Sequence, residues 1–136
     1  MKIYFAGSIS SGRQDVGVYQ KIIGILKQHG QVLTEFIGDS NLSALGEGNI
    51  TDKEIHDRDM EWLLSADMIV AEVTNPSLGV GYEIGRALEH GIKVICLYRP
   101  SEGKRLSAMI KGAPGVKVLI YENVDELNDL IPVLDA

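Results

Sequence analysis

A glycine- and serine-containing run at residues 75–85 holds the side chains best suited to chemistry. It follows an apolar stretch at 68–73 and precedes a helical pattern that reaches His90. The pattern predicts a strand that enters a turn and leaves it as a helix, with Glu83 in the first helical turn. Such a turn exposes backbone N–H groups at the positive end of a helix, where an anion binds well. A phosphate site beside a fixed carboxylate suggests an enzyme that acts on a nucleotide or a sugar phosphate.

Glu83 has a structural explanation as well as a chemical one. The helix dipole alone favours an acidic residue in a first turn, so Glu83 could serve only to start the helix. Because Ser77, Gly79 and Gly81 precede it in a turn that suits an anion, the chemical role is favoured. The positive helix end is then expected to keep Glu83 ionised, which suits a nucleophile better than a proton donor.

Asp59 is a second candidate because it interrupts an apolar helical face. The capping box at 51–54 predicts the start of a helix that runs over 51–66. The apolar side chains on one face of that helix are Ile55, Trp62, Leu63 and Ala66. Asp59 lies in the middle of this face and His56 lies at its border. An isolated buried charge is costly, so two interpretations stay open: a structural ion pair with Arg58 or a nearby loop, or a carboxyl tuned for proton transfer or sugar binding.

Asp59 and Glu83 together show the division of roles found in a retaining glycosidase, with one nucleophilic carboxylate and one acid or orienting group. Tyr4, on the predicted first strand, has two open interpretations. It is either a core aromatic residue or a hydrogen-bond donor to the nucleophilic carboxylate. No His, Cys or Asp cluster has the spacing of metal ligands, so the sequence predicts no metal and no other cofactor.

The first predicted loop contains Gly7 and Gly12 at the spacing of a P-loop. Arg13 and Gln14 stand where that motif requires Lys and Ser or Thr, which disfavours a nucleoside triphosphatase. The dinucleotide-binding fingerprint is not matched either. The loop is therefore either a flexible turn with serine N-caps or a loop that wraps a sugar or a phosphate.

The elements that position these residues alternate along the chain. Short apolar runs predict strands at 2–6, 31–36, 68–73, 92–98 and 117–121. Helical patterns lie at 13–29, 51–66, 80–90, 102–111 and 124–134. This alternation predicts an α/β fold: a doubly wound, five-stranded parallel sheet with helices on both faces, flavodoxin-like or Rossmann-like, in the order 2-1-3-4-5. Ligands of such sheets bind beyond the carboxyl ends of the strands, so the loops at 7–12 and 74–81 should share one crevice.

Length and charge exclude several classes of protein. The 136 residues suit one domain over 1–136, and no apolar run reaches the ~20 residues that span a membrane. The net charge of −6, with scattered Lys and Arg, argues against nucleic-acid binding but allows a small anionic substrate. One cysteine, Cys96, excludes an intrachain disulfide and suits the cytoplasm.

Several short segments carry a family resemblance over nearly the whole chain. They lie at 4–9, 32–35, 55–59, 61–63, 71–74, 76–83 and 106–110. Together they resemble the 2′-deoxynucleoside 5′-phosphate N-hydrolases, relatives of the nucleoside 2-deoxyribosyltransferases. The resemblance implies hydrolysis of the N-glycosidic bond of a deoxynucleoside monophosphate, which yields a free base and deoxyribose 5-phosphate.

The same resemblance implies roles for individual residues. Glu83 would be the nucleophile that attacks the anomeric carbon, Tyr4 would support it, and Asp59 would orient the sugar or assist departure of the base. Ser77 and Gly79 would bind the 5′-phosphate. His56 lies where family members approach the base.

Two further segments are implied in substrate binding. The first-loop positions are Gly7, Ser8, Ile9, Ser10 and Arg13. Family members carry Arg where this chain has Ser10, and Arg13, one turn away, is a candidate to supply that charge. Ser107 matches the serine that the family lends to the phosphate site of the neighbouring subunit, with Met109 in the same segment, so a homodimer is implied.

Three alternatives stay open at this point. A nucleoside 2-deoxyribosyltransferase would use the same glutamate but pass the sugar to a second base, although Ser77 and Ser107 fit a phosphate-binding hydrolase better. A ribonucleotide N-glycosidase differs only in its tolerance of a 2′-hydroxyl. A nucleotide-binding sensor would only hold its ligand, but a pure anion binder gains nothing from the two carboxylates Asp59 and Glu83.

Overall fold

The computed structural model describes residues 1–8, 16–34 and 50–130, in which strands and helices alternate. The elements are β1 (Lys2–Ala6), α1 (Val16–Leu26), β2 (Gln31–Leu33), α2 (Asp52–Ser65), β3 (Met68–Glu72), α3 (Leu78–Glu89), β4 (Lys93–Tyr98), α4 (Ala108–Lys111), β5 (Val116–Ile120), the 3₁₀ helix η2 (Val124–Glu126) and α5 (Leu127–Leu130). Each strand overlaps an apolar run that predicted it. None of the described helices has both the length and the apolar character needed to cross a bilayer.

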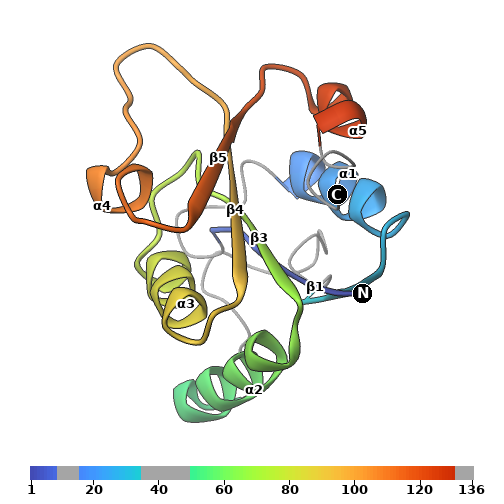
Figure 1. Ribbon diagram of the computed structural model, residues 1–136, viewed down its shortest axis with the longest axis vertical. Coiled ribbons are helices and arrows are strands. Elements are labelled where there is room, and N and C mark those ends of the chain that lie inside the picture. The colour runs from blue at the N-terminus through green and yellow to red at the C-terminus, as the bar shows by residue number, and fades with distance from the viewer. Residues whose placement is uncertain (9–15, 35–49, 131–136) are drawn as a thin grey trace.

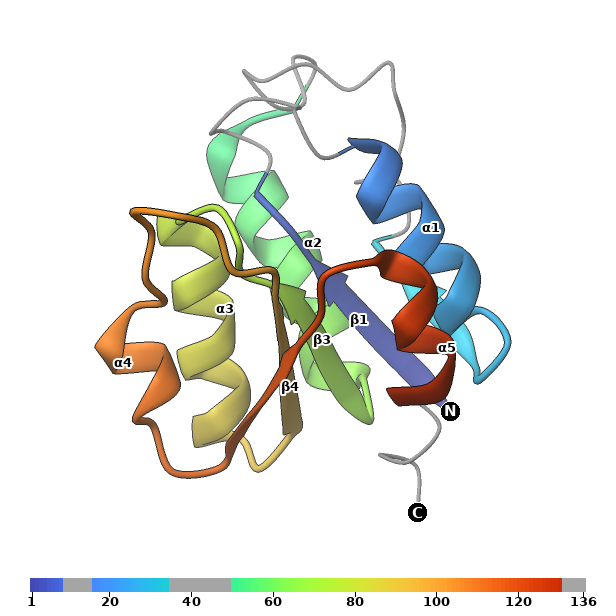
Figure 2. The ribbon, with the colours of Figure 1, turned by 90° about the horizontal axis from the view of Figure 1, so that it is seen from above.

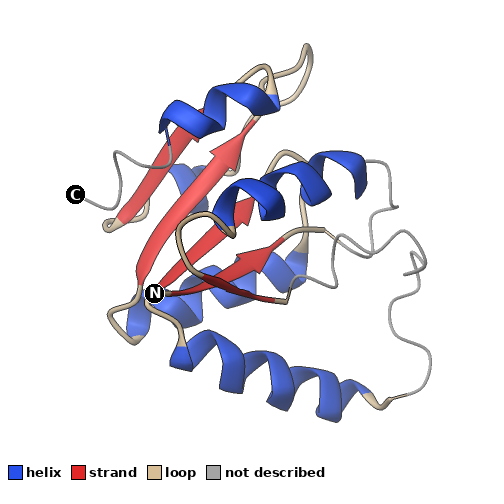
Figure 3. Cartoon of the chain, turned by 90° about the vertical axis from the view of Figure 1, so that its right-hand side faces the viewer, coloured by secondary structure: helices blue, strands red, loops and turns tan. Residues whose placement is uncertain are grey.

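The strands form one parallel sheet in the order β2-β1-β3-β4-β5, which confirms the predicted fold class and strand order (Figure 3). The chain leaves β1 toward one edge and returns to the other side of β1 as β3. The switch point therefore lies between these two strands, where Tyr4 pairs with Ile69 and Ala6 with Ala71. Ligands of doubly wound sheets bind beyond the carboxyl ends of the strands at this point.

Helices cover both faces of the sheet, α1 and α5 on one side and α2 and α3 on the other (Figures 1 and 2). Successive side chains of a strand point to opposite faces, so β1 contributes to two cores. Ile3 and Phe5 join the core under α1, whereas Tyr4 and Ala6 join the core under α2 and α3. The alternation therefore points the Tyr4 hydroxyl toward the face with α2 and α3. It is the only polar atom among the side chains of residues 3–6.

The start of α3 differs from the prediction. The Ser77 side chain accepts a hydrogen bond from the Val80 N–H at 3.3 Å and caps the helix, so α3 begins at Leu78 rather than at residue 80. Gly79 and Gly81 consequently lie inside the helix instead of in the preceding turn. Glu83 lies in the second turn, and its predicted place in the first turn is wrong.

Other element bounds are shorter than predicted. β2 ends at Leu33 because Thr34 has a φ of 63°, which leaves the extended region of the backbone. The helix predicted at 102–111 is reduced to α4, which starts only after the Ser107 N-cap. Of the helix predicted at 124–134, the described part consists of η2 and α5.

Candidate active site

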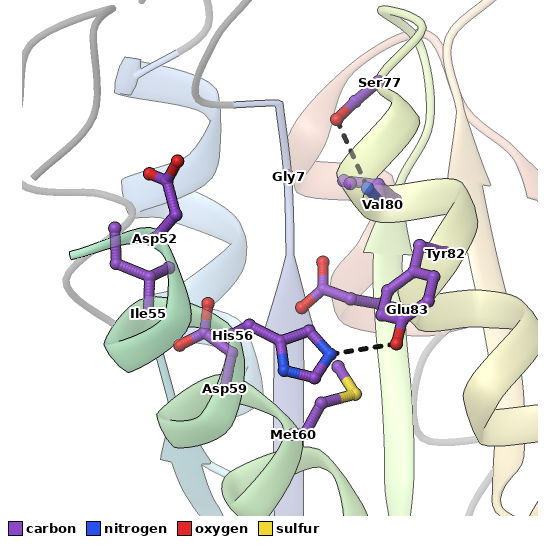
Figure 4. Close-up of a pocket in the computed structure, with 11 residues that line it drawn as sticks. Gly7, Asp52, Ile55, His56, Asp59, Met60, Ser77, Val80, Tyr82 and Glu83 are labelled. Carbon is purple, nitrogen blue, oxygen red and sulfur yellow. Dashed lines mark hydrogen bonds between the residues drawn. The ribbon is translucent and has the colours of Figure 1, made fainter.

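A pocket of about 350 Å³ opens between α2 and α3 beyond the end of β1 (Figure 4). Its lining comes from Gly7 after β1, from Asp52, Ile55, His56, Asp59 and Met60 on α2, and from Ser77, Gly79, Val80, Tyr82 and Glu83 at the start of α3. The volume lies in the range of small-molecule sites. The predicted meeting of the first loop with the loop after β3 is confirmed for Gly7 and Ser77.

Tyr4 and Glu83 are joined by a hydrogen bond, in which the Tyr4 hydroxyl donates to Glu83 Oε2. Of the two interpretations of Tyr4, the bond to the carboxylate is therefore present, although the ring is also a core residue, 1% exposed. Burial of the ring, together with the nearby Glu83 and Asp59 carboxylates, raises the pKa of Tyr4 far above its usual value. Tyr4 consequently stays neutral and acts as a donor to Glu83.

The acidity of Glu83 differs from the expectation. Burial of the side chain raises the pKa of Glu83 to about 7; the hydrogen bond from Tyr4 lowers the pKa, and the Asp59 carboxylate raises it. The expectation that the helix end keeps Glu83 well ionised is wrong, because Glu83 lies beyond the first turn and partly out of water. Near neutral pH the carboxyl thus populates both protonation states.

Of the two interpretations that the sequence left open for Asp59, the structure shows the ion pair, and the role in chemistry stays a prediction. Asp59 accepts hydrogen bonds from Arg58 Nε at 3.1 Å and Nη2 at 3.0 Å, so the structural ion pair is present. The Arg58 guanidinium also lies 5.0 Å from the centre of the Trp62 ring, which holds it in place. Asp59 is nevertheless 21% exposed and lines the pocket, so its carboxylate remains accessible to a ligand.

A chain of polar groups crosses the mouth of the pocket from α3 to α2. Arg86 Nη1 donates to the Tyr82 hydroxyl at 2.6 Å, and the Tyr82 hydroxyl lies 2.9 Å from His56 Nε2 (Figure 4). His56 Nδ1 lies 3.0 Å from Asp57 Oδ1. His56 thus lines the pocket as predicted, whereas Tyr82 and Arg86 were missed. The spacing of Tyr82 and Arg86, four residues apart beside Glu83, could have indicated them.

The first loop was predicted to contact the substrate, and its two described residues, Gly7 and Ser8, differ in their position relative to the pocket. Gly7 lines the pocket, whereas Ser8 is buried, does not line the pocket, and donates its N–H to the Tyr19 hydroxyl at 3.0 Å. A Cβ on Gly7 would lie 3.0 Å from the Tyr19 ring, so glycine is needed there for close packing. Ile9, Ser10 and Arg13 lie outside the described residues.

Ser107 and Met109 lie apart from Glu83, in a neighbouring pocket of about 530 Å³ between α3 and α4. The two pockets share Ser77 and Val80 at the N-terminal end of α3. Ser107 is exposed and Met109 is 82% exposed. Within one chain, therefore, Ser107 and Met109 approach Ser77 but not the carboxylate pair.

Within the described ranges, no group of three or more His, Cys, Asp or Glu side chains could hold a metal ion. The absence of a metal in the mechanism stays a prediction, as does the absence of any other cofactor. Burial raises the pKa of Cys96 to about 12, which disfavours the reactive thiolate form.

The parallel sheet, with an acidic pocket at its switch point, belongs to a known class. The family model described as nucleoside 2-deoxyribosyltransferase matches residues 3–122, and the chain belongs to this family. Within it, the chain is similar to two proteins named 5-hydroxymethyl-dUMP N-hydrolase. The one from Danio rerio is 53% identical over 134 residues, covering 96% of this chain and 93% of the relative. The one from Esox lucius is 58% identical over 115 residues, covering 83% and 79%.

The solved structures confirm the fold. A Clostridium botulinum CMP N-glycosidase aligns with a TM-score of 0.72 at 19% identity, over 98% of this chain and 99% of that chain. The predicted resemblance to the deoxynucleoside monophosphate N-hydrolases is confirmed by the named relatives.

Proposed function

We propose that the protein hydrolyses the N-glycosidic bond of 2′-deoxynucleoside 5′-monophosphates to a free nucleobase and 2-deoxyribose 5-phosphate. The observation that carries this proposal is the Glu83 carboxyl, which accepts a hydrogen bond from Tyr4 and shares a pocket with Asp59. The names of the two fish relatives, which specify N-hydrolysis of a deoxynucleoside monophosphate, support the same reaction.

The proposed mechanism proceeds in two displacements at C1′ of the sugar. The Glu83 carboxylate forms a bond to C1′ while the C1′–N bond breaks, and the bonding electron pair leaves with the base. Water then attacks C1′ and the Glu83 carboxylate leaves; the proton that the water loses neutralises the departed base, and the configuration at C1′ is retained. Tyr4 holds Glu83 in place, and Asp59 orients the sugar or assists departure of the base.

The proposed phosphate site is the N-terminal end of α3. The Ser77 hydroxyl already accepts the Val80 N–H, which leaves its own proton available for a phosphate oxygen. Gly79 lies inside a helix, where glycine lowers stability, and among the described residues a Cβ there would meet only Ser77 Oγ, at 3.8 Å. A close approach of ligand to the backbone at Gly79 would explain a glycine that packing does not require.

We also propose a homodimer in which Ser107 and Met109 of one protomer face the phosphate site of the other. Large apolar side chains are exposed on this side of the molecule: Leu78 is 96% exposed and Met109 is 82% exposed. Apolar surface of this kind favours association. The exposed Ser107 at the N-cap of α4 is then within reach of a second chain.

Mixing two inactive variants tests whether Ser107 acts across the dimer. Glu83→Gln removes the nucleophile and Ser107→Ala removes the shared hydroxyl, so a mixed dimer has one intact site only if Ser107 crosses the interface. After subunit exchange in an equal mixture, we expect about a quarter of wild-type activity. Activity equal to the average of the two separate variants would place Ser107 in the site of its own chain.

The test of the reaction itself is base release from purified protein. We would incubate it with the common deoxynucleoside monophosphates, 5-hydroxymethyl-dUMP, the matching nucleosides and ribonucleotides, and separate the products by chromatography. Release from deoxynucleoside monophosphates alone supports the proposal. No release from any compound, with ligand binding retained, would favour a nucleotide sensor.

Transfer of the sugar to a second base is the second candidate, because the family model carries the name of a transferase. Addition of a free base separates the two reactions. A hydrolase yields deoxyribose 5-phosphate at the same rate with or without the added base. A transferase yields a new nucleotide and depends on that base.

We place the protein in the cytoplasm with a small nucleotide as its partner. Cys96 is buried with its thiol free, which is compatible with a reducing compartment. The net charge of −6 disfavours binding to a nucleic acid.

A further inference from the structure

A second glutamate, Glu72, lies outside the pocket at the carboxyl end of β3. It is 1% exposed, yet its carboxylate accepts three hydrogen bonds. The donors are the Thr74 N–H at 2.7 Å, the Thr74 hydroxyl at 2.9 Å and the Tyr121 hydroxyl. All three partners donate, so the arrangement suits an ionised, acceptor-only carboxylate.

This carboxylate connects the segments that leave three neighbouring strands. Thr74 follows β3, and its hydroxyl accepts the N–H of Arg99, the residue that follows β4, at 3.0 Å. Tyr121 follows β5, and its N–H donates to the Tyr98 carbonyl at 3.1 Å. The carboxyl ends of β3, β4 and β5 are thereby held together around one buried group.

Stability alone does not account for a charged group at this position. Burial raises the pKa of Glu72, and the hydrogen bonds from Tyr121 and Thr74 oppose that rise. A well-packed apolar side chain often stabilises a core as well as a buried charge does. What the carboxylate adds is specificity, because its hydrogen bonds hold the Thr74 and Tyr121 donors in a defined position around one group.

The segment that Glu72 directs is the one that leads to the proposed phosphate site. Thr74 is held on both its N–H and its hydroxyl, and only Asn75 and Pro76 separate it from the Ser77 cap of α3. Pro76 restricts the backbone of this short connection further. A displacement of Thr74 would therefore be passed to Ser77 and to the first N–H groups of α3.

We propose that Glu72 is a positioning residue that holds Ser77 and the N-terminal end of α3 in the position that binds the phosphate of the substrate. Glu72 acts through Thr74 and contacts no reacting atom. The proposal rests on the proposed function, because it assumes that the phosphate binds at Ser77.

The test compares two products of the proposed reaction, one with a phosphate and one without. Calorimetry gives the dissociation constants of 2-deoxyribose 5-phosphate and of thymine for the wild-type protein and Glu72→Gln, which keeps the volume of the side chain. We expect the constant for the sugar phosphate to rise roughly tenfold, the size of a misplaced hydrogen bond to a charged group, and that for thymine to stay unchanged. In turnover, KM should rise and kcat should stay near its wild-type value.

Two further sets of variants separate positioning from loss of stability. Ile22→Val removes one methylene from the core under α1, which also contains Tyr121, and should weaken neither ligand. If Glu72→Gln does not fold, Thr74→Val and Thr74→Ser replace it. Thr74→Val removes the hydroxyl and should weaken only the sugar phosphate, whereas Thr74→Ser keeps the hydroxyl and should recover most of the affinity.

Each contrary outcome has a separate meaning. Equal affinity of wild type and Glu72→Gln for the sugar phosphate would overturn the positioning role while leaving the proposed function in place. An equal loss for both ligands would show general disruption and would also overturn it. A wild-type protein that does not bind 2-deoxyribose 5-phosphate would contradict the proposed phosphate site, and the role of Glu72 with it.

Discussion

Glu72 and Glu83 both lie near the carboxyl ends of the strands, and each accepts a hydrogen bond from a tyrosine hydroxyl. Their surroundings differ. Glu72 is enclosed and has three donors, whereas Glu83 lines a pocket and faces Asp59 across it. Burial raises the pKa of both carboxyls, and Glu83 reaches about 7. Burial alone therefore does not indicate a catalytic role for a carboxylate; a pocket and an incomplete set of donors are the features that favour Glu83 for the proposed role.

The largest expected effect separates these two glutamates. Glu83→Gln should reduce base release at least about a thousandfold, because it removes the proposed nucleophile. Glu72→Gln should retain kcat and lose only affinity for the phosphate. Chromatographic rates under saturating substrate, with thermal unfolding as the check on folding, measure both. Equal losses of kcat in the two variants would contradict the different roles assigned to Glu83 and Glu72.

Asp59→Asn should have the next largest effect, about a hundredfold in kcat, which is usual for loss of a group that assists proton transfer or orientation. The variant also removes a negative charge that raises the pKa of Glu83. The acidic limb of the pH profile of kcat/KM should therefore move to lower pH. A limb that stays in place would show that Asp59 does not act on the Glu83 carboxyl.

Tyr4→Phe should reduce kcat about tenfold, the effect of one lost hydrogen bond to a charged group. The wild-type kcat/KM should rise as pH increases through about 7, because in the proposed mechanism only ionised Glu83 attacks C1′. The Tyr4 hydrogen bond lowers the pKa of Glu83, so its removal should shift this limb to higher pH, opposite to the shift for Asp59→Asn. Shifts in the same direction for both variants would contradict the opposite effects of Tyr4 and Asp59 on the pKa of Glu83.

The smallest effect is expected at the mouth of the pocket. Tyr82→Phe breaks the exposed contacts with His56 and Arg86 but leaves the ring in place. We expect kcat/KM to fall by no more than about threefold, because exposed hydrogen bonds contribute little. The ratio of kcat/KM between substrates with different bases should change more than kcat/KM for any one of these substrates. Unchanged base preference would remove His56 and Tyr82 from base recognition.

Much of the fold could be predicted from the sequence because it depends on local pattern. Alternating apolar runs and helices predicted the strand order. The apolar face around Asp59 identified this residue as a candidate but left open whether it forms an ion pair or takes part in chemistry; the structure places it both beside Arg58 and at the pocket. The start of α3 was mispredicted because Pro76, Gly79 and Gly81 resembled a turn, while the Ser77 cap decided the helix start. This shift moved Glu83 out of the first turn.

The remaining features depend on contacts between distant segments. The Tyr82 contact with His56 requires that α2 and α3 lie at a given separation across β1, which no local pattern encodes. The bond from Tyr121 to Glu72 joins residues 49 positions apart. The pKa of Glu83 likewise depends on Tyr4 and Asp59, which approach it only in the folded chain.

Mass spectrometry of the quenched enzyme tests most directly whether Glu83 attacks the sugar. We would quench turnover of a deoxynucleoside monophosphate with acid and map the peptides of the protein. We expect a mass increase equal to deoxyribose 5-phosphate less one water on the peptide that contains Glu83, and none in Glu83→Gln. An adduct on another residue, or base release by Glu83→Gln at the wild-type rate, would contradict it.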